Sequence, residues 1–386
     1  MKTYTFMNKT VELFDIEMDG GLVYKIKNRR EESKHLYPFH MLEKRNQVVG
    51  VKSFNAWWQG RRIPNSRGGI KTALELLGIS LDELAEKALG LSLSDQYWIR
   101  PSEDISWEDV NFFTNELSDD VGELLFEGKW MDGSLESPNN TSDGVVRKKW
   151  KIINGVRCLI KGSSSLLVLQ PQPFREKFAS ELLGKMLGQR VHKFQEYVKY
   201  DLLWDDDRVY SVCPNFVTED TEYVSMNQIN EALLWKKSNN QSEFNWCEGL
   251  FGENKRLLHL LLAIDYILLN EDRHFGNFGF IRDTNTGELL CPAPIFDTGN
   301  CLFYDSNKLN EHSVSSKPFS SDFSKQLKLI DSSLIADELE LAYSAVEELF
   351  WHSFDGCFET HERLQTILGI AKTRCERLMR TTLVKP

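Results

Sequence analysis

A nearly continuous apolar run extends over residues 256–269. Leucine, isoleucine and alanine fill most of its positions, and a helix that is apolar on all sides is typical of a protein core. The run is fourteen residues long and is interrupted by His259 and Asp265. It is therefore too short and too polar to span a membrane. We expect a buried helix that ends where the chain becomes polar.

The pattern after this helix predicts a β-hairpin. Residues 278–281 read as a strand, 283–287 contain the Asp, Thr, Asn and Gly of a turn, and 288–290 read as the returning strand. A helix, a loop, a hairpin and a second loop thus follow one another up to Gly299.

A second hairpin is predicted upstream and is followed by a helix. Residues 147–153 and 156–161 read as strands on either side of Asn154-Gly155, the strongest short-range signal for a hairpin turn. Residues 174–187 then place apolar side chains on one helical face. These side chains are Phe174, Phe178, Leu182 and Met186.

The two ends of the chain add further elements but little chemistry. Residues 10–16 and 22–26 predict two short strands, and 69–90 carries leucines at helical spacing. Residues 333–350 and 361–380 show apolar spacing with charged outer faces, which is typical of helices that pack on a core.

The composition indicates a globular protein with a large core. The chain has 386 residues, 41% of them hydrophobic, and a formal net charge of −11. This acidic balance argues against a surface that attracts nucleic acid. Residues 55–62 mix tryptophan and arginine, and we expect packed tryptophans at a helix end rather than a nucleic-acid contact. The composition supports two or three packed units.

Cysteine usage and the N-terminus favour a cytoplasmic location. The seven cysteines are scattered, form no C-x-x-C pair and are odd in number, which favours reduced thiols over disulfides or a zinc site. The first residues lack the apolar core of a signal peptide, and no transmembrane span is predicted.

The candidate catalytic residues lie in the two loops on either side of the predicted hairpin at residues 278–290. Asp272 and Asn277 are five positions apart, and Asp297 follows the hairpin. Kinases use this arrangement: the first Asp orients the acceptor hydroxyl and accepts its proton, while the Asn and the later Asp hold Mg²⁺ on the phosphates of ATP. Amide and carboxylate oxygens are suitable ligands for that metal. Each piece alone is explained better as an ordinary turn, but their joint occurrence in order favours a kinase centre.

The residues around these positions resemble a known family. Residues 272–279 (Asp-Arg-His-Phe-Gly-Asn-Phe-Gly) and 293–300 (Ala-Pro-Ile-Phe-Asp-Thr-Gly-Asn) resemble the catalytic and metal-binding segments of the HipA-like serine/threonine kinases. That family comprises kinase toxins of bacterial toxin–antitoxin modules and their relatives. The similarity is strongest over residues 90–305. The Asp-Arg-His-x-x-Asn form is also similar to the catalytic loop of phosphoinositide kinases, so this segment leaves the substrate open.

A kinase also needs a cation and an acidic partner for it. Lys161 ends the strand that follows Asn154-Gly155 and could hold the nucleotide phosphates, although a strand-end lysine in solvent is the plainer alternative. Glu176 and Glu181 on the following helix are both candidates to pair with Lys161, since both lie at the margin of the apolar face. The family resemblance favours Glu176.

The resemblance implies further nucleotide contacts. Ser142, Asp143 and Gly144 fall where the phosphate-covering loop would lie, although this loop has a single glycine. Ser142 is then a candidate for self-phosphorylation. The hinge that binds adenine would lie near 213–216, where Pro214 offers no amide donor, so Asn215 or Phe216 would supply it.

Two further assignments concern the acceptor side. His274 has no partner at zinc-ligand spacing, and we expect it to contact the phosphates. Residues 308–328, rich in serine and lysine, lie where kinases bind peptide substrates, but a solvated loop is the plainer interpretation.

We therefore expect an α+β chain with a two-lobed, protein-kinase-like fold. The expected parts are an N-terminal subdomain (1–132), a small β-rich lobe (133–224) and a helical lobe (225–386). ATP and Mg²⁺ would be the cofactors, and a protein with a Ser or Thr acceptor the substrate. An antitoxin is a candidate partner by resemblance, whereas a nucleic acid or a membrane is not expected. A phosphoinositide-type or small-molecule kinase, or a pseudokinase that acts by binding a partner, remains an alternative.

Overall fold

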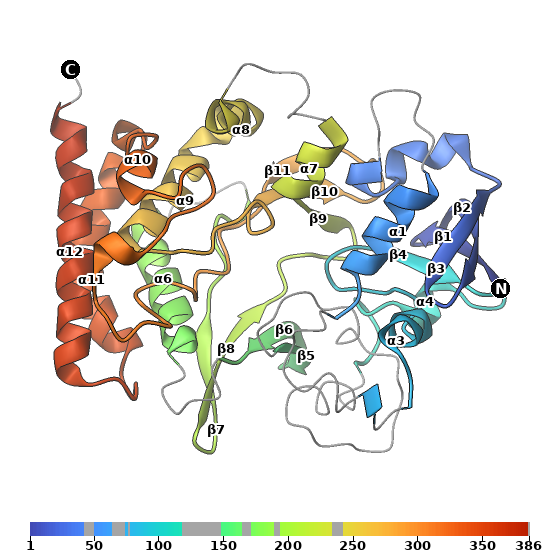
Figure 1. Cartoon of the computed structure of the whole chain (residues 1–386), viewed down its shortest axis with the longest axis horizontal. Coiled ribbons are helices and arrows are strands. Elements are labelled where there is room, and N and C mark those ends of the chain that lie inside the picture. Colours follow the sequence, from blue (N-terminus) through green and yellow to red (C-terminus); the bar gives the residue numbers. More distant parts are fainter. Residues whose placement is uncertain are drawn as a thin grey trace. The chain divides into compact units, whose positions relative to one another are not determined.

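A computed structural model gives the architecture (Figure 1). It describes residues 1–41, 50–63, 74–75, 78–117, 148–163, 171–188, 194–233 and 242–384. The chain forms two compact units, each made of three segments. The first unit comprises 1–161, 214–237 and 280–290, and the second comprises 162–213, 238–279 and 291–386. Both contain helices and strands, which confirms the α+β class. The expected three-part division stays a prediction.

The first unit begins with an antiparallel sheet of order β3-β2-β1-β4. Its strands are β1 (Lys2–Asn8), β2 (Val11–Asp19), β3 (Leu22–Lys27) and β4 (Tyr97–Arg100). Helix α1 (Val51–Gly60) contributes to the same core, where Phe54 packs edge-on against Phe6. The two short strands near the N-terminus are thereby confirmed. Trp57 and Trp58 are buried in this core, as expected.

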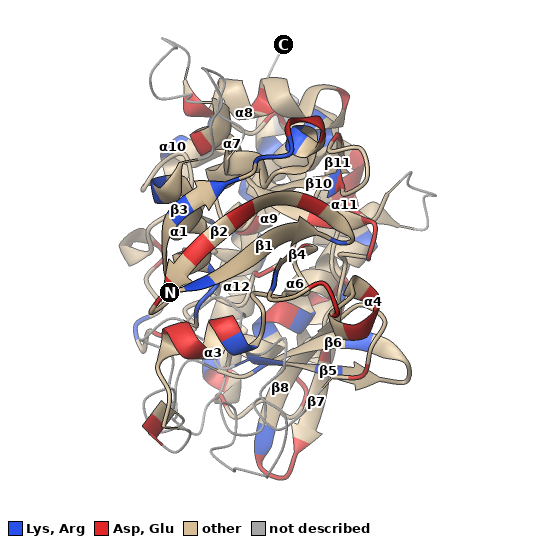
Figure 2. Cartoon of the chain, turned by 90° about the vertical axis from the view of Figure 1, so that its right-hand side faces the viewer, with Lys and Arg blue, Asp and Glu red and all other residues tan. Residues whose placement is uncertain are grey.

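Opposite charges face each other on the neighbouring strands β2 and β3 of this sheet. Glu17 is the partner of Lys25 across β2 and β3, and Asp15 is the partner of Lys27. Figure 2 shows the acidic bands of β2 beside the basic bands of β3. Such cross-strand pairs stabilise the register of a sheet.

The first unit also contains the two predicted hairpins. Strands β5 (Lys148–Ile153) and β6 (Val156–Lys161) pair around Asn154-Gly155, both of which adopt positive φ, as a tight hairpin turn requires. Strands β10 (Gly279–Asp283) and β11 (Leu289–Pro292) form a sheet with β9 (Thr221–Ser225), in the order β11-β10-β9. Both hairpin predictions are confirmed. The remaining helices of this unit are α3 (Leu81–Lys87), α4 (Trp107–Val110) and α7 (Met226–Leu233).

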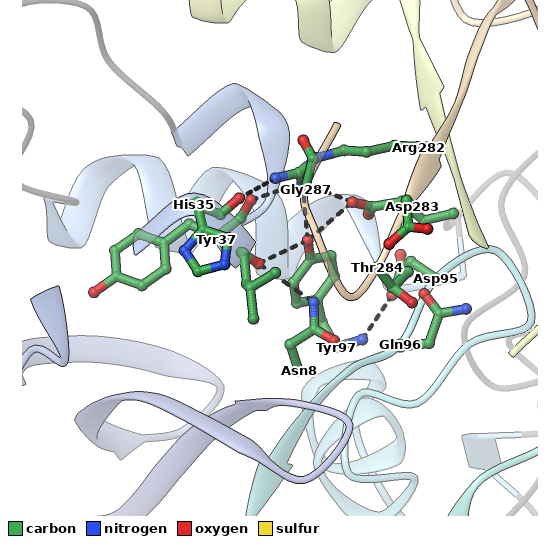
Figure 3. A network of polar contacts seen from close by, with 12 residues as sticks. Asn8, His35, Tyr37, Asp95, Gln96, Tyr97, Arg282, Asp283, Thr284 and Gly287 are labelled. Atoms are coloured by element: carbon green, nitrogen blue, oxygen red, sulfur yellow. Dashed lines mark hydrogen bonds and ion pairs between the residues drawn. The ribbon is translucent and has the colours of Figure 1, made fainter. Parts of the chain in front are cut away.

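A buried polar network fixes the β10–β11 hairpin inside the first unit (Figure 3). The Arg282 guanidinium donates to the Gly287 carbonyl at 2.7 Å, to the Tyr37 carbonyl at 2.9 Å and to Glu222 Oε1 at 2.7 Å. It also donates to the His35 carbonyl. Tyr97 Oη donates to Glu222 at 3.0 Å. Burial raises the pKa of Glu222 to about 7, against the opposing effect of Arg282.

The second unit is mainly helical. Helices α6 (Gln172–Leu187), α9 (Lys255–Leu268), α10 (Phe323–Leu327), α11 (Ala336–Ser353) and α12 (His361–Val384) pack side by side (Figure 1). Rings from α6 and α11 interlock, with Phe178 edge-on to Phe350 at 5.2 Å between centroids. Helix α8 (Glu243–Phe251) and the hairpin of β7 (Asp201–Asp205) and β8 (Arg208–Pro214) complete the unit. Every side chain of α9 from Leu257 to Leu268 is buried, which confirms the predicted core helix.

Candidate active site

The polar loop begins where α9 ends. Leu269 adopts the left-handed conformation (φ 54°), which stops the helix and turns the chain. Asn270 then folds back on the helix: its amide side chain donates to Asp265 Oδ1 at 2.7 Å, and its own Oδ1 accepts from the backbone N–H of Asp272 at 3.2 Å. The start of the loop is thus tied to the last turn of a rigid buried helix.

A fully buried ion pair organises the rest of the loop. Arg273 Nε and Nη2 donate to the two carboxylate oxygens of Asp265 at 2.9 and 3.0 Å, and neither side chain has measurable exposure. Arg273 also donates to the carbonyl of Asn277 at 3.0 Å and to that of Phe296 at 2.5 Å. Its Nη2 reaches Thr298 Oγ1 at 3.2 Å. One guanidinium therefore binds both predicted loops.

Backbone bonds hold the same two loops side by side. The N–H of Glu271 donates to the Asn300 carbonyl at 3.1 Å, and the N–H of Leu302 donates to the Leu268 carbonyl at 2.9 Å. The segments that carry Asp272, Asn277 and Asp297 are therefore brought together in the second unit, although the β10–β11 hairpin separates them in sequence.

The carboxylate of Asp272 has a partner on each oxygen. Asn300 Nδ2 donates to Oδ2 at 3.1 Å, and Lys317 Nζ donates to Oδ1 at 2.8 Å. Asn300 is itself oriented by Gln172 at the start of α6, whose Nε2 donates to Asn300 Oδ1 at 2.7 Å. Ser163 Oγ donates in turn to Gln172 Oε1 at 2.9 Å. The Asp272 side chain stays part-exposed at 39%, so it is accessible from solvent.

The two candidate metal ligands are oriented by their surroundings. Asn277 is buried, and its Nδ2 donates to the Asp272 carbonyl at 3.1 Å, so Oδ1 is the atom that would coordinate a cation. Asp297 adopts positive φ (58°), and its backbone N–H donates to Tyr200 Oη at 3.3 Å. Positive φ is uncommon in residues other than glycine, although aspartate adopts it more readily than most.

The two candidate glutamates on α6 have different neighbours. Glu176 is buried and accepts from Ser211 Oγ, and it lies against Gly299, where an added Cβ would come within 2.9 Å of its Cγ. Glu181 instead accepts from Ser353 on α11 and lies 3.1 Å from His352 Nδ1. Glu176 therefore lies next to the Asp297 loop, whereas Glu181 faces α11. The pairing of Glu176 with Lys161 stays a prediction.

The other candidate nucleotide contacts lie in or near the first unit. Lys161 is the last residue of β6, opposite Lys148. The backbone N–H of Asn215 donates to the Arg157 carbonyl at 2.8 Å and its side chain to the Leu93 carbonyl at 3.0 Å, so this amide is already engaged. Phe216 packs edge-on against Tyr223. Ser142, Asp143 and Gly144, including the self-phosphorylation candidate, lie outside the described residues.

Several acidic groups lie around Asp272. Burial, with Asp272 and Asp305, raises the pKa of Glu271, while Lys317 opposes that shift. Burial and the same acids raise the pKa of Tyr304. His274 is exposed, and its Nδ1 accepts from the N–H of Gly276 at 3.0 Å, so a neutral ring carries its proton on Nε2. Among the described residues, no cluster of three or more His, Cys, Asp or Glu side chains could hold a metal alone.

Sequence reasoning missed four residues of this site. Asp265 and Arg273 left a signal, because an aspartate within an apolar helix demands a buried partner. Asn300 and Lys317 lie in the segments 293–300 and 308–328 that the sequence had marked, but their contacts with Asp272 could not be foreseen, because these depend on how distant loops fold.

Comparisons with known proteins place the fold. No protein-family profile matches the chain. A segment is 29% identical over 108 residues to the serine/threonine-protein kinase CtkA of Helicobacter pylori (strain J99), and this covers 25% of the present chain and 32% of CtkA. The match thus spans about a third of that relative. A crystal structure of a Helicobacter pylori proinflammatory kinase CtkA aligns over 61% of this chain and 91% of that chain, at 16% identity and a TM-score of 0.48.

A structure of the Shewanella oneidensis MR-1 toxin–antitoxin system HipA, HipB and its operator DNA aligns over nearly the whole chain. It covers 99% of the present chain and 100% of the matched chain, at 13% identity and a TM-score of 0.59. Similarity at this identity establishes the architecture. This chain therefore has the fold of the HipA-like kinases, which confirms the kinase-like architecture and the resemblance predicted from its motifs.

Proposed function

We propose that this protein is an ATP- and Mg²⁺-dependent serine/threonine protein kinase of the HipA-like type. The observation that carries the proposal is the buried Asp265–Arg273 pair, which binds the Asp272–Asn277 loop and the 296–298 segment in one place. A protein that only needed two surface turns would gain little from burying a charge pair to align them. The local sequence similarity to a serine/threonine kinase adds support.

The donor atoms fit a magnesium nucleotide. Mg²⁺ is usually bound by one or two protein carboxylates together with the phosphates of a substrate, and it prefers oxygen. The Asn277 amide oxygen and the Asp297 carboxylate provide such a set. When bound, the metal neutralises charge on the phosphates. Lys161 would provide a positive charge for the phosphates, and Glu176 would hold the lysine in place. His274, which is exposed, would also contact the phosphates.

Asp272 is the proposed base. Its carboxylate would orient the acceptor hydroxyl and accept the proton as the hydroxyl oxygen attacks the terminal phosphorus. Asn300 holds one of its oxygens at 3.1 Å, which fixes the plane of the carboxylate. A positioned general base accelerates such a step by about 10²–10⁴-fold.

The similar proteins support a proposal for the acceptor and for a partner. CtkA is a serine/threonine-protein kinase, which favours a protein hydroxyl as the acceptor. The matched HipA occurs in a complex with HipB and operator DNA, so an antitoxin is a candidate partner for the present chain in the cytoplasm. No helix within the described residues is both long and apolar enough to cross a membrane.

Transfer of radiolabel from ATP tests the proposal. The purified chain is incubated with labelled ATP and Mg²⁺ together with mixed proteins, with phosphoinositide vesicles, or with buffer alone. We expect labelled Ser and Thr in the protein sample, and at least a ~100-fold loss of labelling in Asp272→Ala. If only the phosphoinositide is labelled, the protein is a lipid kinase and the protein-kinase proposal is wrong. Nucleotide binding without any transfer would indicate a pseudokinase.

A further inference from the structure

A lysine from outside both predicted loops reaches the proposed base. Lys317 Nζ lies 2.8 Å from Asp272 Oδ1, and the two residues are 45 positions apart in sequence. Their side chains are 47% and 39% exposed. An ion pair this exposed contributes little to folding stability, so its position calls for another explanation.

The segment that carries Lys317 is anchored on the catalytic loop. Phe319 packs edge-on against Phe275 at 5.8 Å between ring centroids and also contacts Phe278 and Phe244. Gln326 Nε2 on α10 donates to the Lys317 carbonyl at 2.7 Å. Ser316 binds the carbonyls of Ser320 and Ser321, which closes a compact turn. The backbone of Lys317 is therefore held, while its ammonium group stays accessible.

We propose that Lys317 is a catalytic residue that binds the terminal phosphate of the nucleotide while it remains hydrogen-bonded to Asp272. The inference rests on the kinase function proposed above. An ammonium group has three N–H donors, and the contact with Asp272 uses one of them. An acceptor hydroxyl bound to the Asp272 carboxylate would lie close to the Lys317 ammonium, because both groups bind the same carboxylate. The phosphorus that this hydroxyl attacks would then also lie near the ammonium.

The charges around the site explain why a cation is needed there. Burial, Asp272 and Asp305 raise the pKa of Glu271, and the positive charge of Lys317 opposes that shift. A nucleotide phosphate brought to these acids would be repelled. The positive charge of Lys317 lowers that repulsion. It lies where the oxygens of the transferred phosphoryl group carry negative charge.

In the transfer step one oxygen–phosphorus bond forms while another breaks. The acceptor oxygen forms a bond to the terminal phosphorus while the bond from that phosphorus to the bridging oxygen breaks. The electron pair stays with the bridging oxygen of the departing ADP, and the hydroxyl proton goes to Asp272. Lys317 keeps its protons throughout and stabilises the equatorial oxygens.

Chemical labelling tests the location of Lys317 without measuring activity. An acyl-phosphate derivative of ATP carries a reactive carbonyl on its terminal phosphate; a nearby lysine amine attacks this carbonyl, forms an amide and releases the nucleotide. We expect labelling at Lys317, found by peptide mapping and suppressed at least ~10-fold by excess ATP, as for a specific site. Exposed Lys325, on α10 in the same part of the chain, should show no such protection.

Nucleotide binding and kinetics give a second test. Lys317→Met should weaken ATP binding about 10-fold and leave ADP binding unchanged, because only ATP carries the terminal phosphate. It should also lower kcat about 100-fold, with partial recovery in Lys317→Arg. The matched control Lys325→Met should behave as the unmodified protein, and thermal melting checks that each variant is folded.

Three results would overturn the inference. A rate increase in Lys317→Met would mean that the lysine only blocks Asp272. Equal losses of ATP and ADP affinity would mean a structural role. ATP-protected labelling at Lys161 but not at Lys317 would reject the role of Lys317 and leave the proposed kinase function intact, whereas protection at neither lysine would reject both.

Discussion

At the residue scale, the orientation of one amide decides the geometry of the proposed base. Asn300 uses Oδ1 to accept from Gln172 and Nδ2 to donate to Asp272, so its two ends cannot be exchanged without losing both bonds. Its backbone carbonyl also accepts from the N–H of Glu271, so both the side chain and the backbone of Asn300 are held in place. Asn300 is therefore a positioning residue for Asp272.

Replacing Asn300 should affect the chemical step more than nucleotide binding. In Asn300→Ala the Asp272 carboxylate can rotate, and we expect kcat to fall about 10-fold with little change in the KM for ATP. Steady-state kinetics on an acceptor protein measure both constants. Asn310→Ala, an exposed asparagine of the same unit, serves as the matched control. An unchanged kcat, or a fall explained entirely by KM, would contradict the assignment.

At the element scale, the polar residues of α9 connect this buried helix to its neighbours. Besides Asp265, the helix carries buried His259, whose Nδ1 accepts from the backbone N–H of Asp331 at 3.0 Å. Since Nδ1 accepts, the proton is on Nε2, which lies 3.0 Å from Glu248 Oε1 on α8. The neutral ring thus joins α8, α9 and the chain before α11. Burial lowers the pKa of His259 below its ordinary value of 6.5, although Glu248 opposes the shift.

Because its pKa is lowered, we expect His259 to reduce the folding stability of the protein in mild acid. The pKa of His259 is lower in the folded than in the unfolded chain, so its contribution is complete above the ordinary pKa of 6.5 and is lost as the pH falls below that value. We expect the urea midpoint to decrease between about pH 7.5 and about pH 5.5. In His259→Gln that decrease should be smaller, because Gln does not titrate. In the exposed-site control His312→Gln it should persist, and an equal decrease in all three proteins would exclude His259 as the cause.

At the scale of the whole molecule, residues far apart in sequence share single buried partners. In the first unit Arg282 donates to the backbone carbonyls of His35 and Tyr37 and to the carboxylate of Glu222 on β9. It also donates to the Gly287 carbonyl in its own hairpin (Figure 3). Arg282 and Glu222 are 1% and 4% exposed. Removing one member of such a pair leaves a buried charge or several carbonyls without a donor, and this costs more than the pair itself contributes.

Arg282→Met should therefore destabilise the first unit strongly. We expect about 3–5 kcal/mol, the cost of breaking a buried ion pair, measured by denaturant unfolding together with hydrogen exchange of peptides from β9 and β10. The double variant Arg282→Met/Glu222→Gln should recover part of this loss, because glutamine replaces the buried carboxyl group with a neutral amide. The control Lys372→Met breaks an exposed pair with Glu347 and should cost less than about 1 kcal/mol. Equal effects of Lys372→Met and Arg282→Met would refute the argument.

Much of this architecture could be predicted because local patterns determine it. The apolar run gave α9 to within one residue at each end, and Asn154-Gly155 located the β5–β6 turn. The Asp272, Asn277 and Asp297 segments could be chosen because three weak motifs occur in order. Periodicity could not separate Glu176 from Glu181, because both lie at the margin of one helical face and only their tertiary neighbours, Gly299 for Glu176 and Ser353 for Glu181, distinguish them. Lys317 was beyond prediction, because a turn rich in serine and lysine has no periodicity that indicates its partner.

The way the backbone alternates between the two units limits how the protein can be dissected. Each unit is assembled from three separate stretches, and residues 280–290, between the two loops that carry Asp272 and Asp297, belong to the first unit. A single cut in the gene therefore cannot yield either half by itself. A C-terminal fragment that starts at residue 162 would carry 214–237 and 280–290 without residues 1–161 of their unit, and one that starts at residue 238 would also lack 162–213 of its own unit. Activity in split versions is expected only when both pieces are co-produced and reassemble.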